Sequence, residues 1–306
     1  MSGTPLLSVS GLTVEFRTRG HRLRAVDGVS LDIGAGETVG LVGESGSGKS
    51  TLGRAILGLV PPAGGTITFG GRDITGASGR ERRALARDIQ VVFQDPYGSL
   101  NPAMKVSSIL AESLRARGKL PSAEVSDRVR DMLNRVALPA AAAGRYPGAF
   151  SGGQRQRLAI ARALMPSPKL VICDEATSAL DLSVQAQILN LLRDLQRQYS
   201  LSYLFIGHNL DVVRFVSHRI VVLYRGVVLE EGPADAVARH PRHPYTQLLV
   251  AAGAGQAAKA GARSELSEGC PFAPRCPLAT DICRERVPRL VRPKKDFALA
   301  CHHVEV

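Results

Sequence analysis

A glycine-rich segment carries the clearest chemical signal in this 306-residue sequence. It reads Gly43-Glu44-Ser45-Gly46-Ser47-Gly48-Lys49-Ser50, followed by Thr51, and it fits the pattern G-x-x-x-x-G-K-[ST]. Glycines let the backbone curl so that successive N–H groups face a phosphate, and a helix that begins there adds its positive end. We expect Lys49 to reach the β- and γ-phosphates of a nucleotide, and the Ser50 hydroxyl to bind Mg²⁺.

Two acidic residues end an apolar segment farther along the chain. Leu170 to Cys173 is followed by Asp174 and Glu175. In parallel sheets, ligands bind beyond the carboxyl ends of the strands, which is where these carboxylates are expected. Asp174 is predicted to hold Mg²⁺ through its water shell. Glu175 is predicted to orient and activate the attacking water, a contribution of ~10²–10⁴-fold for a general base. Cys173 is expected to be a buried small hydrophobe.

A second possible anion site precedes a predicted helix. Ser151-Gly152-Gly153-Gln154 offers small residues whose N–H groups are free at the start of that helix. One chain rarely needs two phosphate-binding elements for one nucleotide, so the phosphate loop alone does not explain why this segment is present.

In their order along the chain, these motifs resemble those of the ATP-binding-cassette ATPase family, over about residues 5 to 250. The matching positions are the loop at Gly43, Gln94 in Val-Phe-Gln-Asp-Pro, the signature Ser151–Gln154, Asp174 with Glu175, Ser178-Ala179-Leu180-Asp181, and His208. The resemblance implies two subunits packed head to tail, with each ATP between one subunit's phosphate loop and the other's signature. It also implies that Gln94 touches Mg²⁺ and the water, that His208 contacts the γ-phosphate, and that Asp181 couples the two sites.

The sequence departs from the family pattern at two places that we expect to be neutral. Phe150 precedes the signature where the family often has Leu, and Ala176 stands where Pro is frequent. Two residues, Phe16 and His21, are candidates for stacking on the adenine ring. All catalytic positions are intact, which predicts a site that hydrolyses ATP.

The C-terminal part resembles the oligopeptide/dipeptide branch of the family. The resemblance rests on His243-Pro244-Tyr245-Thr246 and on Cys270-Pro271 with Pro274-Arg275-Cys276-Pro277. It implies an importer with a second, homologous ATPase subunit, two integral membrane permease subunits and an external solute-binding protein. Taken alone, His-Pro-Tyr predicts only a turn into a helix. The cargo is open between peptides and nickel or another small solute.

The tail holds a group of cysteines whose spacing does not choose a metal. Cys270, Cys276, Cys283 and Cys301 are spaced C-x5-C-x6-C-x17-C, unlike zinc ribbons or the bacterial ferredoxin pattern. Four thiolates hold either zinc or an iron–sulfur cluster. Resemblance to the importer branch favours a [4Fe-4S] cluster, with Zn²⁺ and free thiols as the alternatives. His302 and His303 are possible replacement ligands.

The pattern of strands and helices around these residues predicts an α/β fold with a P-loop core. Residues 1 to 35 alternate in hydrophobicity and predict short antiparallel strands. Residues 38–42, 67–69, 89–93, 170–173, 203–207 and 220–224 predict further strands, and their alternation with helices at 50–59 and 184–199 predicts a mainly parallel sheet.

The domain boundaries follow from changes in pattern and composition. We expect an ATPase domain over residues 1–250, a helical subdomain at about 95–164, a linker at 251–268 and a tail at 269–306. Within the subdomain, Val125, Val129, Met132, Leu133 and Val136 share one helix face, and Ser122 is the expected N-cap.

Composition limits the location and the partners. No apolar run reaches the ~18 residues of a membrane span, and Met1 to Ser10 lacks the pattern of a signal peptide. We therefore expect a protein that is kept in the cytoplasm, and the resemblance to the importer branch implies a peripheral subunit at the cytoplasmic face of the plasma membrane. The net charge of +12 favours polyanions, and it supports a rival, a soluble ATPase of this family acting on nucleic acid or ribosomes. A second rival is a regulator that binds ATP without hydrolysing it. Aromatic residues make up only 5% of the sequence, so stacking platforms for nucleic acid are scarce, and we expect no nucleic acid partner.

Overall fold

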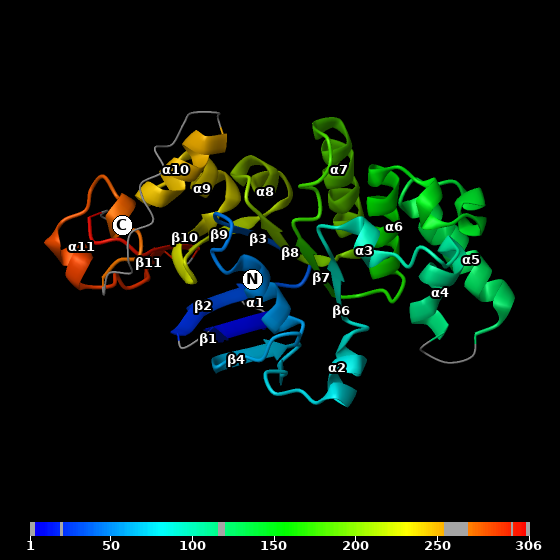
Figure 1. The fold of residues 1–306 in the computed structure, drawn as a ribbon, viewed down its shortest axis with the longest axis horizontal. Helices are drawn as coiled ribbons and strands as arrows, with labels where there is room; N and C mark the ends of the chain where they lie inside the picture. Colours follow the sequence, from blue (N-terminus) through cyan, green and yellow to red (C-terminus); the bar gives the residue numbers. More distant parts are fainter. Residues whose placement is uncertain (1–3, 19–20, 116–119, 254–268, 295, 304–306) are drawn as a thin grey trace. The chain divides into compact units, whose positions relative to one another are not determined.

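The computed structural model describes residues 4–18, 21–115, 120–253, 269–294 and 296–303 (Figure 1). They form two compact units, residues 1–76 with 205–306, and residues 77–204. The boundary falls inside strand β8 (Ser202–Gly207). Among the described residues, no helix combines the length and the apolar character that crossing a bilayer requires.

The first unit contains a small antiparallel sheet, as the alternating N-terminal pattern predicts. β1 (Leu7–Thr18) pairs with β2 (His21–Ile33) on one side and with β4 (Gly64–Phe69) on the other, and β4 pairs with β5 (Arg72–Asp73). Alternate residues of β1 are buried, among them Leu7, Val9 and Val14. The first two strands are longer than expected, and β1 bends at irregularities in its register with both neighbours.

The larger sheet of the first unit is mixed rather than mainly parallel. β3 (Thr38–Val42) runs parallel to β9 (Arg219–Tyr224), whereas β10 (Val227–Pro233) is antiparallel to β9. The order continues with β12 (Phe297–Leu299) and β11 (Val291–Lys294), both antiparallel to their neighbours. The C-terminal tail therefore supplies two strands that its sequence pattern does not predict.

Helices follow the strands of this unit. They are α1 (Lys49–Ile56), α8 (Leu210–Val216), α9 (Ala234–Arg239), α10 (Pro244–Gly253) and α11 (Asp281–Glu285), with a short 3-10 helix η3 (Ala273–Arg275). The predicted linker at 251–268 begins too early, because Ala251 to Gly253 are still part of α10. The rest of that linker, residues 254–268, lies outside the described residues.

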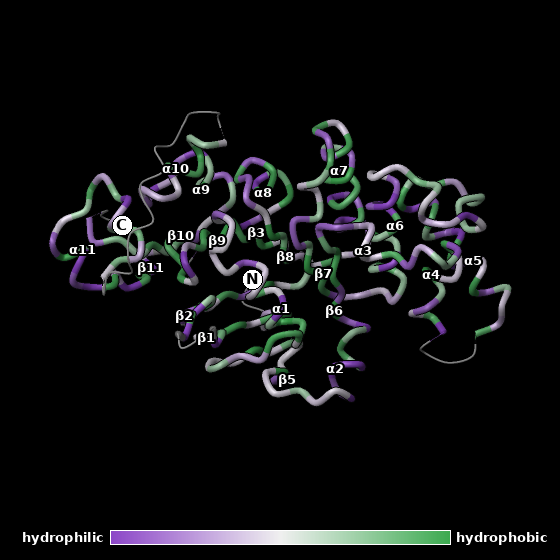
Figure 2. Tube along the Cα trace, viewed as in Figure 1, coloured by the Kyte–Doolittle hydropathy of each residue, from purple (hydrophilic) through white to green (hydrophobic). Residues whose placement is uncertain are grey.

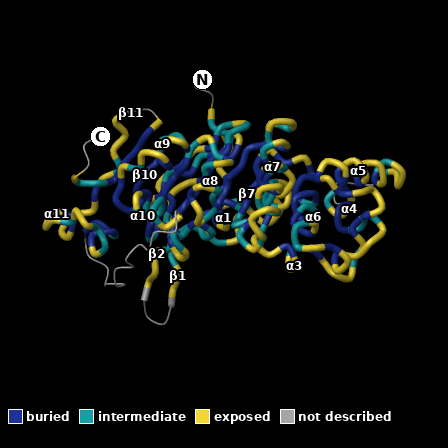
Figure 3. Tube along the Cα trace, turned by 90° about the horizontal axis from the view of Figure 1, so that it is seen from above, coloured by how far each residue is buried: buried dark blue, intermediate teal, exposed yellow. Residues whose placement is uncertain are grey.

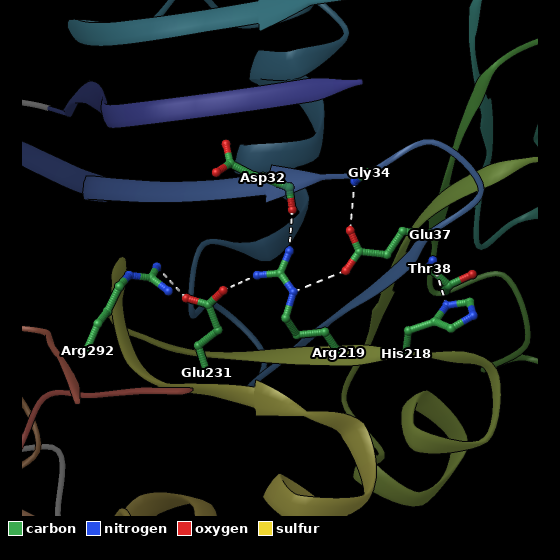
Figure 4. A network of polar contacts seen from close by, with 8 residues as sticks. All are labelled: Asp32, Gly34, Glu37, Thr38, His218, Arg219, Glu231 and Arg292. Atoms are coloured by element: carbon green, nitrogen blue, oxygen red, sulfur yellow. Dashed lines mark hydrogen bonds and ion pairs between the residues drawn. The ribbon is translucent and has the colours of Figure 1, made fainter. Parts of the chain in front are cut away.

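A chain of ion pairs joins the tail to the strands of the first unit (Figure 4). Arg292 Nη2 lies 2.6 Å from Glu231 Oε2, and the other oxygen of Glu231 pairs with Arg219. Arg219 also pairs with Glu37 at 3.1 Å and donates to the carbonyl of Asp32 at 2.6 Å. Glu231 is buried, so both of its guanidinium partners are needed to offset the loss of solvent.

The second unit is mostly helical around a parallel strand pair. β6 (Ile89–Val92) pairs with β7 (Leu170–Asp174) in register from Ile89–Leu170 to Val92–Cys173. Figures 2 and 3 show β7 as hydrophobic and buried, and Leu170 to Cys173 are at most 1% exposed. The helices are α2 (Gly79–Leu85), α3 (Pro96–Ser99), α4 (Val106–Arg115), α5 (Ser122–Arg135), α6 (Gly152–Leu164) and α7 (Leu182–Tyr199), with 3-10 helices η1 (Ala140–Gly144) and η2 (Pro147–Ala149).

The predicted apolar face of α5 is confirmed, but its predicted cap is wrong. Val125, Val129, Met132, Leu133 and Val136 are all at most 9% exposed. The N-cap is Pro121, which makes no side-chain cap hydrogen bond, and Ser122 is the first helical residue. The fixed backbone of Pro121 starts the helix one residue earlier than the side-chain preference of serine suggests.

Candidate nucleotide-binding site

The phosphate loop connects β3 to α1 in the first unit, and its glycines are required by its shape. Gly46 and Gly48 have φ angles of +79° and +103°, which side chains other than glycine rarely adopt. A Cβ at Gly43 would lie 2.1 Å from the carbonyl oxygen of Leu223, and one at Gly48 would lie 2.1 Å from that of Ala25. The loop therefore lies directly against neighbouring backbone, with its exposed tip at Ser45 and Gly46.

Lys49 is buried at the centre of the loop. Its ammonium group donates to the carbonyl oxygens of Gly43 at 2.7 Å and Glu44 at 2.8 Å, and the residue is only 4% exposed. Ser50 and Thr51, in the first turn of α1, are half-buried. A buried cation within a curl of backbone N–H groups fits the charge of a nucleotide phosphate, and the Ser50 hydroxyl is an oxygen ligand of the kind Mg²⁺ prefers.

Two residues far away in the sequence also bind this loop, and the sequence analysis assigns them no chemistry. The Glu44 N–H donates to the Tyr245 hydroxyl at 2.8 Å. The Glu44 carboxylate accepts two hydrogen bonds of 2.8 Å from the guanidinium of Arg275, and these lower the pKa of Glu44. Spacing along the chain holds no signal for either contact, because more than 200 residues separate the partners.

His208 and the two candidates for adenine stacking also belong to the first unit. His208 follows Gly207, the last residue of β8, and is exposed. Phe16 lies on β1 with 39% of its surface exposed, and His21 begins β2. Neither arrangement decides which residue stacks on adenine, so that assignment stays a prediction.

The second unit brings Gln94 to the same sheet edge as the two acids. Because β6 and β7 run parallel with Val92 opposite Cys173, both chains leave the sheet at that edge. Gln94 is exposed, whereas Asp174 and Glu175 are partly buried. Burial raises the pKa of the Cys173 thiol to about 12, as expected for an inert cysteine inside the strand.

The backbone at Glu175 is held in a conformation that costs energy. Its φ angle is +49°, in the left-handed region, which residues other than glycine seldom adopt. The Ser178 N–H and hydroxyl both donate to its carbonyl, at 3.1 and 3.0 Å. Such strain of about 1–3 kcal/mol persists where neighbouring contacts fix it, often at active sites.

Asp181 lies at the start of α7. Its carboxylate accepts from the Val184 N–H at 2.9 Å and from the Ser183 hydroxyl at 3.1 Å, so it is the N-cap of that helix. These hydrogen bonds lower the pKa of Asp181 and keep it an anion.

The signature segment at the start of α6 is built by local contacts. The Ser151 hydroxyl accepts from the Gln154 N–H at 3.4 Å, and the Gln154 side chain accepts from the Ser151 N–H at 3.1 Å, a reciprocal capping box. A Cβ at Gly153 would lie 2.4 Å from the Val184 side chain, so glycine lets α6 approach α7 closely. Phe150 is 5% exposed and keeps the apolar contact expected for that position.

The four tail cysteines lie in the first unit around η3 and α11. Cys270 and Cys283 are buried, and Cys276 and Cys301 are half-buried. The Cys283 sulfur lies 3.2 Å from His303 Nε2, and His302 contacts the carbonyl of Arg286 at 3.0 Å. Over the described part of the chain, no set of three or more Cys, His, Asp or Glu side chains is arranged to hold a metal ion. The four-thiolate centre stays a prediction.

The structure thus divides the predicted residues between the two units. Gly43 to Thr51, His208 and the cysteines belong to the first, and Gln94, the signature, Asp174, Glu175 and Asp181 belong to the second.

Two family models match this chain, one over the region of the nucleotide motifs and one over the C-terminal region, and relatives match most of its length. The model described as "ABC transporter" matches residues 26–178, and the model described as "Oligopeptide/dipeptide transporter, C-terminal region" matches residues 229–283. A relative from Brucella abortus is 50% identical, over 92% of this chain and 90% of its own. Another from Brucella ovis is 45% identical, over 98% of each chain. Both are named as peptide import ATP-binding proteins.

Solved structures show the same fold. CbiO1 from Clostridium perfringens, part of the ABC transporter complex cbiONQ, has a TM-score of 0.70 at 29% identity, covering 78% of this chain and 92% of its own. The ATP-binding cassette MJ0796, in a dimeric post-hydrolysis state with ADP and Pi, has a TM-score of 0.68 at 30% identity, covering 74% and 98%. With the phosphate loop, the signature and the acidic strand in family order, the chain belongs to the ATP-binding proteins of ABC transporters, in their oligopeptide/dipeptide import branch.

Proposed function

We propose that this chain hydrolyses ATP to drive the import of oligopeptides or dipeptides. The observation that carries the choice of cargo is the C-terminal region at residues 229–283, which matches the oligopeptide/dipeptide model. The names of the Brucella relatives point the same way. ATP supplies the free energy, and the membrane subunits and a solute-binding protein would select the peptide.

In the first unit, the phosphate loop would bind the triphosphate. Backbone N–H groups of the loop and the N-terminus of α1 would face the phosphates, with Lys49 beside the β- and γ-phosphates. His208 would contact the γ-phosphate from the end of β8. The buried position of Lys49 supports this role, because a cation in a site shielded from water attracts phosphate more strongly than an exposed one.

In the second unit, the end of β7 would carry out the hydrolytic step. Glu175 would accept a proton from the attacking water as that water's oxygen bonds to the γ-phosphorus and the bond to ADP breaks. Its strained backbone supports this, because it fixes the carboxylate at the strand end. Gln94 and Asp174 would be ligands of Mg²⁺, as Ser50 would be in the first unit, and Mg²⁺ supplies charge neutralisation at the phosphates.

The signature would act on the nucleotide of a partner subunit. A second, homologous ATPase chain packed head to tail would place its phosphate loop against Ser151–Gln154, and Asp181 would couple the two sites. The dimeric form of the related MJ0796 cassette supports this arrangement. Two integral membrane permease subunits and an external solute-binding protein would complete the importer, with this chain at the cytoplasmic face of the plasma membrane.

For the tail we favour a [4Fe-4S] cluster, with zinc as the alternative. Its ligands would be Cys270, Cys276, Cys283 and Cys301. Its support is the resemblance of the tail to the importer branch and a backbone contact that joins two of the cysteines, in which the Cys270 N–H donates to the Cys283 carbonyl at 2.8 Å. Iron, zinc and acid-labile sulfide should be measured on chain purified without oxygen. About four irons and four sulfides per chain would establish the cluster, one zinc would replace it, and no metal would leave free thiols.

The transport function is tested by isolating the tagged protein from its native membranes in mild detergent and identifying what accompanies it. Two multi-span proteins, a second ATPase and a solute-binding protein would support the importer. Peptide binding by that solute-binding protein would then support the cargo, whereas binding of nickel alone would overturn it. Recovery of ribosomal or nucleic-acid-binding proteins without any membrane subunit would contradict transport.

A further inference from the structure

The Cys-bearing tail contacts the phosphate loop through the side chain of Arg275. Its two terminal nitrogens each donate to a different carboxylate oxygen of Glu44, both at 2.8 Å. Two parallel hydrogen bonds between a guanidinium and a carboxylate are among the strongest polar contacts that side chains make. The side chain of Arg275 is 15% exposed and that of Glu44 is 44% exposed, so the pair lies at the border of solvent.

The rings of Phe272 and Tyr224 pack against the guanidinium of Arg275 and hold it in place. Phe272 is fully buried, with its ring centroid 5.4 Å from those of both Tyr224 and Tyr245. The guanidinium carbon of Arg275 lies 5.8 Å from the Phe272 ring centroid and 5.9 Å from that of Tyr224. Since the rings bury the tail against the end of β9, the position of Arg275 is set by the core of the unit rather than by solvent.

The backbone gives Arg275 a short connection to the cysteines. Arg275 ends η3 and directly precedes Cys276, and its N–H donates to the carbonyl of Phe272 at 2.9 Å. Cys270 accepts through its carbonyl from Ala273 at 3.0 Å at the start of the same turn. The guanidinium is thus held by a single turn that lies between two of the four tail cysteines.

Glu44 is an unfavourable neighbour for a nucleotide. It is an acid within a loop whose backbone and lysine attract phosphate, and an ionised carboxylate there repels a triphosphate. The charges that face it are Arg275, Arg225 and Lys49, and the hydrogen bonds from Arg275 are the largest of the influences that keep the pKa of Glu44 low. Glu44 therefore stays ionised, and its charge must be offset by a cation.

We propose that Arg275 is a positioning residue of the phosphate loop, which holds and neutralises the Glu44 carboxylate so that the loop binds ATP with full affinity. Tyr245 completes the arrangement by accepting the Glu44 N–H, so the tail and the His-Pro-Tyr segment fix both the backbone and the side chain of this loop residue. The C-terminal region thereby sets the nucleotide affinity of a motif more than 200 residues away.

The experiment is a double-mutant cycle on the full chain, with the Kd for a fluorescent ATP analogue and Mg²⁺ as its readout. Arg275→Ala should raise Kd about three- to tenfold, since the pair is charged and bidentate but partly exposed. Glu44→Gln alone should lower Kd, because it removes the carboxylate that repels the phosphates while Arg275 keeps its positive charge. The double variant Arg275→Ala/Glu44→Gln should return to within about twofold of the wild type. The loss in Arg275→Ala should shrink in high salt, which screens the carboxylate.

Control variants separate this proposal from a simple loss of folding. Arg284→Ala removes an exposed tail arginine that pairs with Asp281, and it should leave Kd unchanged. Arg275→Lys keeps the charge but not the fork, and its Kd should lie between wild type and Arg275→Ala. If Arg275→Ala binds normally, or if the double variant is as weak as Arg275→Ala, the proposal is overturned. It rests on ATP binding by the wild type, so a wild-type chain that fails to bind the analogue refutes that function instead.

Discussion

The phosphate loop and the signature both place small residues at the start of a helix, yet they are held in opposite ways. The N-cap of α1 is Gly48, which has a left-handed backbone and makes no side-chain cap hydrogen bond, and the loop before it is held by Tyr245 and Arg275 from the C-terminal region. The N-cap of α6 is Ser151, whose capping box closes within four residues. One anion site depends on distant parts of the chain, and the other is built from its own sequence.

This difference predicts which substitutions should affect the phosphate loop and which should affect the signature. Changes in the tail should reach the phosphate loop through Arg275, whereas the signature should respond only to changes in α6, its cap and the neighbouring α7. Nucleotide affinity and helix geometry are therefore separate properties that different substitutions should alter.

The largest expected effect separates binding from turnover. Glu175→Gln removes the proposed base and should lower the ATPase rate by ~10²–10⁴-fold while ATP still binds. Lys49→Ala should instead weaken binding itself, because it removes the buried cation of the phosphate loop. Phosphate release and equilibrium binding of the ATP analogue measure the two properties. Near-normal turnover of Glu175→Gln would remove Glu175 from its role.

A methyl group at the signature tests the close helix approach. Gly153→Ala brings a Cβ to 2.4 Å from Val184, and it should cost about 1–3 kcal/mol of stability through overpacking. Urea unfolding measures the loss, and the ATPase rate should fall with Kd for ATP unchanged. Val184→Ala in the same chain should recover much of the stability, and a lack of recovery would mean that the contact is not the cause.

Two helix-cap variants test whether the function of the signature depends on its own capping box. Ser151→Ala and Ser78→Ala each remove a capping box, at α6 and at α2. Each should cost about 0.5–2 kcal/mol in urea unfolding. Only Ser151→Ala should also lower ATP turnover, because Ser78 lies outside the nucleotide motifs. Equal turnover in both variants would show that the cap does not support the signature's role.

The smallest effect is a pH dependence at the phosphate loop. The pKa of Glu44 lies below its ordinary value of 4.5, mainly because of the hydrogen bonds from Arg275. A lowered folded-state pKa means that the pair stabilises the protein above the ordinary value and that this contribution is lost as pH falls through the folded value. The difference in Tm between wild type and Arg275→Ala should be constant near neutral pH and should shrink as pH falls below the ordinary Glu44 pKa of 4.5 and through the lower folded-state pKa. A difference that persists there would exclude Glu44 as the partner.

The sequence predicts well what local spacing determines. The strand at Thr38–Val42 has the predicted bounds, and the apolar face of α5 is buried as its periodicity indicates. The signature's Ser151 and Gln154 also have capping-box spacing, so their contact could have been read from the sequence.

What the sequence does not predict depends on contacts between distant segments. β11 and β12 are short, and they are strands only because β12 pairs with β10 and β11 pairs with β12. The antiparallel half of the larger sheet was missed for that reason. Arg275 looks like one of many surface arginines until the fold places it beside Glu44. The helix start at Pro121 was missed because a backbone constraint outweighed a side-chain preference.

The two tail strands also protect the edge of the sheet from pairing with another copy of this chain. Without β12, the backbone groups of β10 at Glu230 and Glu231 would lack their partners and could pair with a strand of another molecule. The strand at that end of the described sheet is instead β11, which is short, irregular in register and interrupted by Pro293, which has no N–H to donate. Removal of β12 should thus expose the edge of β10 and favour aggregation.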